Sequence, residues 1–116
     1  MITLEHFDPA MLLTSNQRLH WAKKGAATAY WRGLGNRAGV RVAPVQRARV
    51  VFWMRFPTNH RRDANNWWPT AKACIDGMVD AGTFPDDDSR HVIGPDMRIE
   101  DERGPHRIRI EIEELS

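Results

Sequence analysis

Apolar and polar residues alternate with a period of two in two separate parts of the chain. Between Arg47 and Phe56 every second residue is apolar, and most of the intervening residues are basic. Between Arg107 and Glu113 three isoleucines alternate with charged residues. Such alternation is typical of a β-strand with one buried face. The sequence therefore predicts strands at 47–56 and 107–113, with shorter strands at 2–7, 91–93 and 97–99, the last two separated by Gly94-Pro95.

Two stretches have the composition of helices. The clearer one covers 70–81, with Pro69 near its start and Gly82 just past its end. The other covers 19–37 and follows the turn-forming residues 14–16, but its three glycines predict that it is weak or broken. The helix expected at 70–81 should bury a stripe made of Ala71, Cys74, Ile75, Met78 and Val79.

Helices interleaved with amphipathic strands indicate an α+β fold, in which one sheet packs helices on a face. A chain of 116 residues has the length of a single domain, here 1–116. The lone Cys74 excludes an intramolecular disulfide and a multi-cysteine zinc site, and we expect it to pack in the helix stripe. No apolar run approaches the roughly 20 residues of a membrane helix, and no signal-peptide pattern is visible, so we expect a soluble, cytoplasmic protein.

The net charge of +2 conceals a strong asymmetry. Residues 1–62 carry 11 Lys and Arg against two acidic residues, whereas residues 63–116 carry 6 against 13. Fourteen of the 17 basic residues are Arg, whose guanidinium group fits phosphate oxygens well. The asymmetry predicts a polyanionic partner for the first part of the chain, with ordinary surface scatter as the alternative.

Acidic residues frame the expected helix 70–81: Asp63 precedes it, Asp76 lies on it, and the triplet 86–88 follows it. We expect the fold to bring Asp63 and the triplet together, where the carboxylates would repel one another unless a cation lay between them. Ligands that are all oxygen favour Mg²⁺ or Mn²⁺ over zinc. The alternative is that Asp63 caps a helix and the triplet forms a solvated acidic turn.

The neighbours of Asp63 add to this hypothesis. Arg61-Arg62 directly precedes it, which suits an anionic ligand such as a phosphodiester. Lys72 would then neutralise charge on the scissile phosphate, or alternatively pair with Asp76 on an exposed helix face. Trp67-Trp68 is either a pair of packing aromatics or, where exposed, a stacking wedge for unpaired bases, and burial of at least one is favoured.

Taken together, the run 61–66 (Arg-Arg-Asp-Ala-Asn-Asn), Lys72, Asp76 and the run 87–89 (Asp-Asp-Ser) resemble the RusA family of Holliday junction resolvases, which are small Mg²⁺-dependent endonucleases of bacteria and phages. The run 14–20 resembles the Ser-Asn-x-Arg turn of that family. The two central strands also fall where the family has strands, so the resemblance spans nearly the whole chain.

The resemblance implies a compact mixed α/β domain that forms a homodimer and cuts four-way DNA junctions symmetrically, with Mg²⁺ as cofactor and Mn²⁺ as a possible substitute. It implies that the catalytic residues are Asp63, Lys72 and Asp88, and that the metal ligands are Asp63, Asp87, Asp88 and Asn65. For contacts with the DNA backbone we expect Arg18, Lys23, Lys24, Arg55, Arg61 and Arg62.

Two departures from the family pattern keep other functions open. Asn65 stands where the family usually has a second Asp, which removes one negative charge, and residues 67–71 add length before Lys72. One alternative is therefore a DNA-binding relative that has lost the nuclease activity. A second is a small interaction module whose acidic half pairs with a basic partner.

Overall fold

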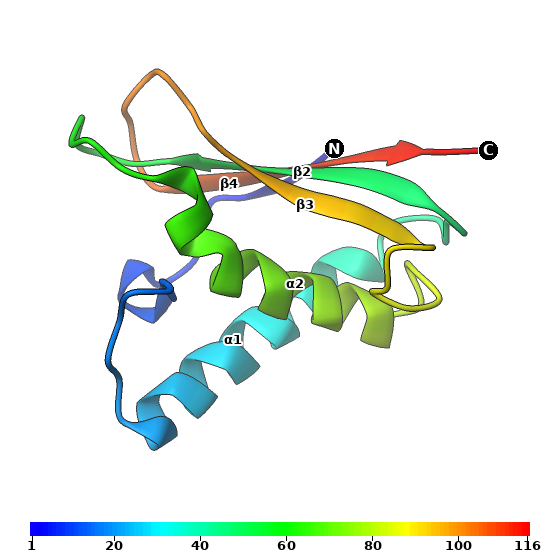
Figure 1. Ribbon diagram of the computed structural model, residues 1–116, viewed down its shortest axis with the longest axis horizontal. Helices are drawn as coiled ribbons and strands as arrows, with labels where there is room; N and C mark the ends of the chain where they lie inside the picture. Colours follow the sequence, from blue (N-terminus) through cyan, green and yellow to red (C-terminus); the bar gives the residue numbers. More distant parts are fainter.

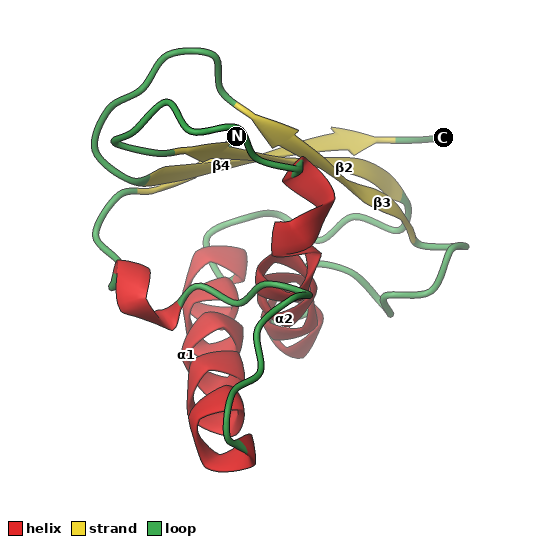
Figure 2. Cartoon of the chain, turned by 60° about the vertical axis from the view of Figure 1, so that its left-hand side comes forward, coloured by secondary structure: helices red, strands yellow, loops and turns green.

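Two helices cover one face of a mixed β-sheet in the computed structural model of the chain, which describes residues 1–116 (Figures 1 and 2). The predicted α+β fold in one domain is confirmed. The elements in chain order are β1 (Ile2–Leu4), the 3₁₀ turn η1 (Pro9–Met11), α1 (Trp21–Gly39), β2 (Ala48–Arg55), the 3₁₀ turn η2 (Ala64–Trp67), α2 (Trp68–Asp80), β3 (Val92–Ile99) and β4 (Arg107–Glu114).

The four strands lie in the order β1-β4-β2-β3. β2 is antiparallel to β4 and parallel to β3, while β1 pairs antiparallel with β4. The two predicted central strands are confirmed as β2 and β4. Their apolar residues face the helices, because Val50 and Phe52 of β2 and Ile110 of β4 are wholly buried. The intervening residues of both strands lie on the opposite face, which no helix covers (Figure 1).

β3 is one continuous strand, so the prediction of two short strands at 91–93 and 97–99 is wrong. Gly94 and Pro95, expected to separate them, lie inside the strand as an irregularity opposite Val50 of β2. Gly94 has a φ of 110°, and a Cβ atom on it would lie 2.6 Å from the carbonyl oxygen of Val50. Glycine therefore lets the strand accommodate one extra residue and continue.

α1 is an unbroken helix of 19 residues, so the prediction of a weak or broken helix is also wrong. The reason is a close crossing with α2. A Cβ atom on Gly35 would lie 2.0 Å from the carbonyl oxygen of Cys74, and one on Gly77 would lie 1.9 Å from that of Arg32. The absence of these side chains lets the two backbones touch, and the packing gained there offsets the poor helix propensity of glycine.

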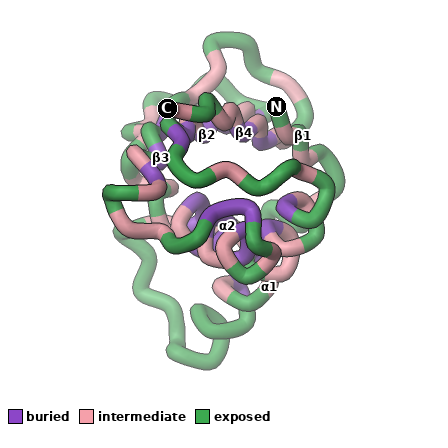
Figure 3. Tube along the Cα trace, turned by 90° about the vertical axis from the view of Figure 1, so that its right-hand side faces the viewer, coloured by how far each residue is buried: buried purple, intermediate pink, exposed green.

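The core fills the space between the helices and the sheet (Figure 3). Trp31 is wholly buried, and its Nε1–H donates a hydrogen bond of 2.7 Å to the carbonyl oxygen of Met11. Cys74 is wholly buried as well, which confirms its predicted packing role, and burial raises the pKa of its thiol to about 12. None of the helices has the length and apolar character needed to cross a membrane.

Candidate functional site

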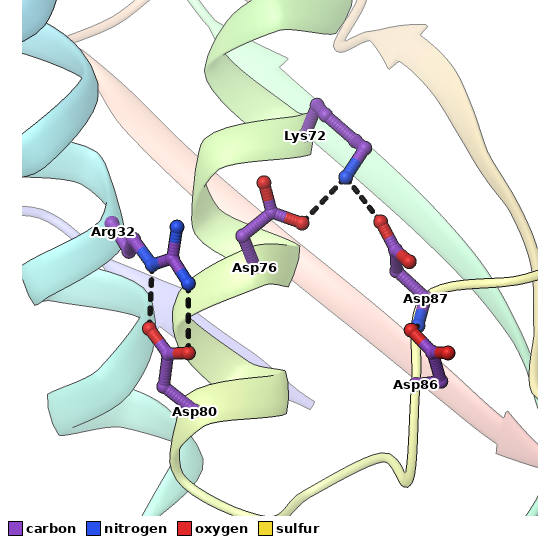
Figure 4. Close-up of polar contacts among 6 residues, drawn as sticks. All are labelled: Arg32, Lys72, Asp76, Asp80, Asp86 and Asp87. Carbon is purple, nitrogen blue, oxygen red and sulfur yellow. Dashed lines mark hydrogen bonds and ion pairs between the residues drawn. The ribbon is translucent and has the colours of Figure 1, made fainter.

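The exposed side of α2 carries Lys72 and Asp76, one helical turn apart. The ammonium of Lys72 donates a hydrogen bond of 2.5 Å to Asp76 Oδ1 and a second one to Asp87 Oδ2 (Figure 4). Asp87 comes from the loop that follows α2 and folds back beside the helix. Each of the three side chains is about one third exposed, at 33%, 30% and 34%. Two carboxylates from separate segments thus hold one accessible ammonium group.

Hydrogen bonds within this cluster shift the pKa values of Lys72 and Asp87. Partial burial alone would lower the pKa of the Lys72 ammonium, but the hydrogen bonds to Asp76 and Asp87 outweigh burial and raise it above its usual value. The hydrogen bond from Lys72, followed by a contact with Asp86, lowers the pKa of the Asp87 carboxyl. At neutral pH Lys72 is therefore a cation and Asp87 an anion.

Asp63 lies directly before η2 and caps it. Its Oδ1 accepts a hydrogen bond of 3.1 Å from the backbone N–H of Asn65, and its carbonyl oxygen accepts one of 3.0 Å from Asn66. Both Asp63 and Asn65 are exposed. Asp63 therefore caps a short helix, which was the alternative to a metal-binding role in the sequence analysis. No hydrogen bond or ion pair joins it to the acidic triplet, from which η2 and the whole of α2 separate it along the chain.

Asp88 contacts Arg90 and His91 and makes no hydrogen bond or ion pair with Lys72. Its Oδ2 accepts a hydrogen bond of 3.0 Å from Arg90 Nη2, and its Oδ1 lies 4.0 Å from His91 Nε2. The hydrogen bond from Arg90 lowers the pKa of the Asp88 carboxyl. Of the acids in the triplet, the one that reaches Lys72 is therefore Asp87.

The turn formed by residues 14–20 contacts η2, and Leu13 just before it contacts the start of α2. The backbone N–H of Ser15 donates a hydrogen bond of 2.8 Å to the carbonyl oxygen of Asn66. Next to it, the buried hydroxyl of Thr70 accepts from the N–H of Leu13 at 2.9 Å and donates to its carbonyl oxygen at 2.8 Å. The bond between Ser15 and Asn66 joins two motifs about fifty residues apart in sequence. The contact between Leu13 and Thr70 lies two residues before Lys72.

The six basic residues expected to bind DNA fall into two groups. Arg55 Nε donates to the carbonyl oxygen of Pro105 at 2.9 Å. The guanidinium of Arg62 lies 4.0 Å from the ring centre of Phe56 and donates to the carbonyl oxygens of Thr58 and His60. These two arginines hold loops in place. The side chains of the other four residues are exposed and make no hydrogen bond or ion pair within the chain: Arg18, Lys23, Lys24 and Arg61.

Aromatic residues near the site differ in exposure. Trp67 packs against Phe56 with ring centres 5.0 Å apart, which confirms that at least one of the paired tryptophans is a packing residue, while Trp68 is 42% exposed. Sequence reasoning overlooked Trp21, which is 80% exposed. The sequence does contain an indication that Trp21 belongs to a binding surface, because it lies between Arg18 and Lys23 in a stretch that contains no acidic residue.

The donors suit a hard divalent cation in kind. Asp63, Asp87 and Asp88 offer carboxylate oxygens and Asn65 an amide oxygen, which are the ligand types that Mg²⁺ takes. The positive charge between Asp76 and Asp87 is supplied by the ammonium of Lys72. In this arrangement, no group of three or more His, Cys, Asp or Glu side chains is assembled around a common point.

The sequence matches no protein-family model and no curated protein closely enough to show a family. The candidate function therefore depends on the residues themselves and on how the fold arranges them.

Proposed function

We propose that the protein is a RusA-like, Mg²⁺-dependent endonuclease that cuts four-way and related branched DNA by hydrolysing phosphodiester bonds. One observation carries the proposal: the segments singled out by the resemblance lie together at the start of α2. The turn 14–20 is bonded to Asn66, and Lys72 is bonded to Asp87 of the acidic triplet. Through Ser15 and Asn66, the basic part of the sequence (1–62) contacts the acidic part (63–116) close to Lys72.

Lys72 is the residue best suited to act on a phosphate. Its side chain is about one third exposed and its ammonium stays protonated at neutral pH, so it would stabilise the charge that develops on the phosphate oxygens during hydrolysis. The residues that we propose to hold Mg²⁺ are Asp63, Asn65, Asp87 and Asp88, and the ion would have to draw their separate segments together. When bound, this ion supplies an activated water and additional positive charge for the phosphate.

Binding of the DNA backbone would fall to the exposed basic residues without partners in the chain, above all Arg18, Lys23, Lys24 and Arg61. Contacts of this kind recognise phosphates and the shape of the DNA rather than its sequence, and they weaken steeply as salt concentration rises.

We also propose a homodimer, which would match the approximate two-fold symmetry of a four-way junction. The uncovered face of the sheet is the surface on which we place the second copy. Along β4 this face changes from Arg107 and Arg109 to Glu111 and Glu113, so a second copy running in the opposite direction sets unlike charges against each other on this strand. Sedimentation velocity should show a dimer that the exposed substitution Glu113→Arg weakens; a monomer at all concentrations would contradict this placement.

The test of the nuclease is incubation of the purified protein with an end-labelled four-way junction, with and without Mg²⁺ or Mn²⁺, beside a linear duplex of matched sequence. We expect paired symmetric nicks in the junction that require the metal. Asp63→Asn should abolish cleavage and leave junction binding largely intact, because the arginine and lysine contacts survive. Asp101→Asn, at an exposed acid outside the site, is the matched control and should cleave normally.

Other outcomes identify the alternatives. Tight junction binding without cleavage by the wild type would indicate a DNA-binding relative that has lost the nuclease activity. Asn65 would then be the first position to test as the cause. Loss of both binding and cleavage in Asp63→Asn would indicate that this residue has a role in folding and would count against the proposed mechanism. Absence of both in the wild type would leave the interaction module.

A further inference from the structure

The first turns of α1 project from the body of the protein. From residue 27 onward, α1 buries one residue every four positions: Ala27, Trp31, Gly35 and Gly39. None of the residues 21–26 is buried. Figures 1 and 2 both show this end of the helix extending away from the sheet. These turns, with the preceding loop, form an exposed surface that we call the α1 tip, residues 18–24.

The α1 tip exposes large apolar side chains to water. Trp21 is 80% exposed, and its nearest ring neighbour is His20, with ring centres 5.4 Å apart. Leu19 is 37% exposed, and it lines a cavity of about 100 Å³ together with Lys24 and Pro69. A tryptophan left this open makes no contribution to the core, so its large flat ring is available for a partner.

The charge of the α1 tip restricts the kind of partner. Arg18, Lys23 and Lys24 are exposed and unpaired, and no acidic residue occurs between Asp8 and Asp63 in the sequence. A second copy seated on the same surface would set these cations against each other, which disfavours self-association there. An exposed aromatic ring flanked by cations is the combination with which proteins hold single-stranded nucleic acid, because the ring stacks on a base and the cations contact phosphates.

We propose that Trp21 stacks on an unpaired or unstacked base of DNA, while Arg18, Lys23 and Lys24 hold the flanking phosphates. The proposal takes DNA as the ligand from the function proposed above. It adds a property that the nuclease chemistry does not require, which is a preference for DNA with open bases over a continuous duplex. At a branched substrate, the open bases would be those at the branch point.

The experiment measures binding of fluorescently labelled oligo-dT and of a labelled duplex of equal length by anisotropy, without divalent metal. We compare the wild type with Trp21→Ala and Trp21→Phe. The matched control is Val40→Ala, at a 65% exposed residue beyond the other end of α1. Trp21→Ala should weaken oligo-dT binding about tenfold and duplex binding far less, since loss of one stacked base has roughly that effect. Trp21→Phe should retain most of the affinity, and Val40→Ala should match the wild type.

The double substitution Lys23→Ala with Lys24→Ala should instead weaken both ligands and reduce the dependence of affinity on salt. Unchanged oligo-dT affinity in Trp21→Ala, or no oligo-dT binding by the wild type, would overturn the proposal. So would an oligomer that Trp21→Ala dissociates, since a second copy would then be the partner. Circular dichroism melts of each variant check that the fold is retained.

The two proposals fail independently. A wild type that cuts no junction but loses oligo-dT affinity in Trp21→Ala would refute the nuclease and keep the stacking role. Metal-dependent cleavage with unchanged oligo-dT affinity in Trp21→Ala would do the reverse.

Discussion

The two sides of α2 differ in what they contact and therefore in what they can do. The inner side is buried, with Cys74, Ile75 and Met78 in the core and Gly77 against the backbone of α1. The outer side presents Lys72 and Asp76, each about one third exposed and joined to the loop beyond the helix. One helix of 13 residues is thus both scaffold and carrier of the candidate chemistry. Substitutions on the inner side should change stability, and those on the outer side should change activity.

The largest effect is expected from Lys72→Met on the outer side. The rate of junction cleavage should fall about 100- to 1000-fold, because a positive charge placed against the reacting phosphate is lost. The melting temperature should change little, since ion pairs that are partly exposed contribute about 0–1 kcal/mol. Single-turnover cleavage at saturating protein measures the rate. An unchanged rate would remove Lys72 from the proposed chemistry.

On the inner side, Gly77→Ala should lower the free energy of unfolding by about 3 kcal/mol or more, because the new Cβ atom would lie 1.9 Å from the carbonyl oxygen of Arg32 and force the helices apart. Gly25→Ala is the matched control, since nothing lies within 4 Å of its Cβ position. It should stabilise the protein by about 0.5–1 kcal/mol. Urea unfolding measures both, and equal effects of the two substitutions would contradict the close crossing.

Glu100→Gln, remote from α2, is a second substitution that should change stability but not the cleavage rate. The side chain of Glu100 is 8% exposed and binds both Arg107 and Arg109. Burial alone would raise the pKa of this carboxyl, but the hydrogen bonds from the two arginines outweigh burial and hold it below its usual 4.5. Glu100→Gln should therefore cost about 2 kcal/mol at neutral pH, without changing the cleavage rate of the folded protein.

The pH dependence has a defined sign. Because the pKa of Glu100 is lower in the folded state, the stability it contributes is present above the unfolded value of 4.5 and is lost as pH falls through the folded value. Urea unfolding of the wild type and Glu100→Gln at neutral and acidic pH should show the difference between them shrinking on acidification. A difference that is constant with pH would contradict the assignment.

The smallest effect is expected from Asn65→Asp. Asn65 is exposed, so the fold should be unaffected, while the added carboxylate should lower the Mg²⁺ concentration for half-maximal cleavage several-fold. A Mg²⁺ titration of the cleavage rate measures this. No change, or a higher requirement, would show that position 65 is not a metal ligand.

The sequence predicted the parts of the fold that local pattern determines. Alternation identified β2 and β4, and helical spacing identified α2 within two residues at each end. Sequence-based prediction failed where a glycine packs against the backbone of a segment that is distant in sequence. From the sequence, Gly35 suggests a broken helix, but in the structure it lets α2 pack closely against α1. Gly94 suggests the end of a strand, but in the structure it lies within β3, opposite Val50.

The candidate site shows the same limit. Spacing along α2 was enough to suggest the pair of Lys72 and Asp76, because residues four apart share a helix face. It did not reveal that Asp87 rather than Asp88 reaches Lys72, since that depends on the path of a loop. The exposure of Trp21 was equally hidden, because it depends on how much of α1 the body covers.

The most direct test of the central claim compares single-turnover junction cleavage and melting temperature in the wild type, Lys72→Met and Ile75→Val. We expect Lys72→Met to lose cleavage and to melt like the wild type. Ile75→Val should melt a few degrees lower, as loss of one buried methyl costs about 1 kcal/mol, and should cleave normally when folded. Cleavage that falls in proportion to melting temperature in both variants, or a wild type that cuts no junction, would contradict the proposed role of Lys72 in junction cleavage.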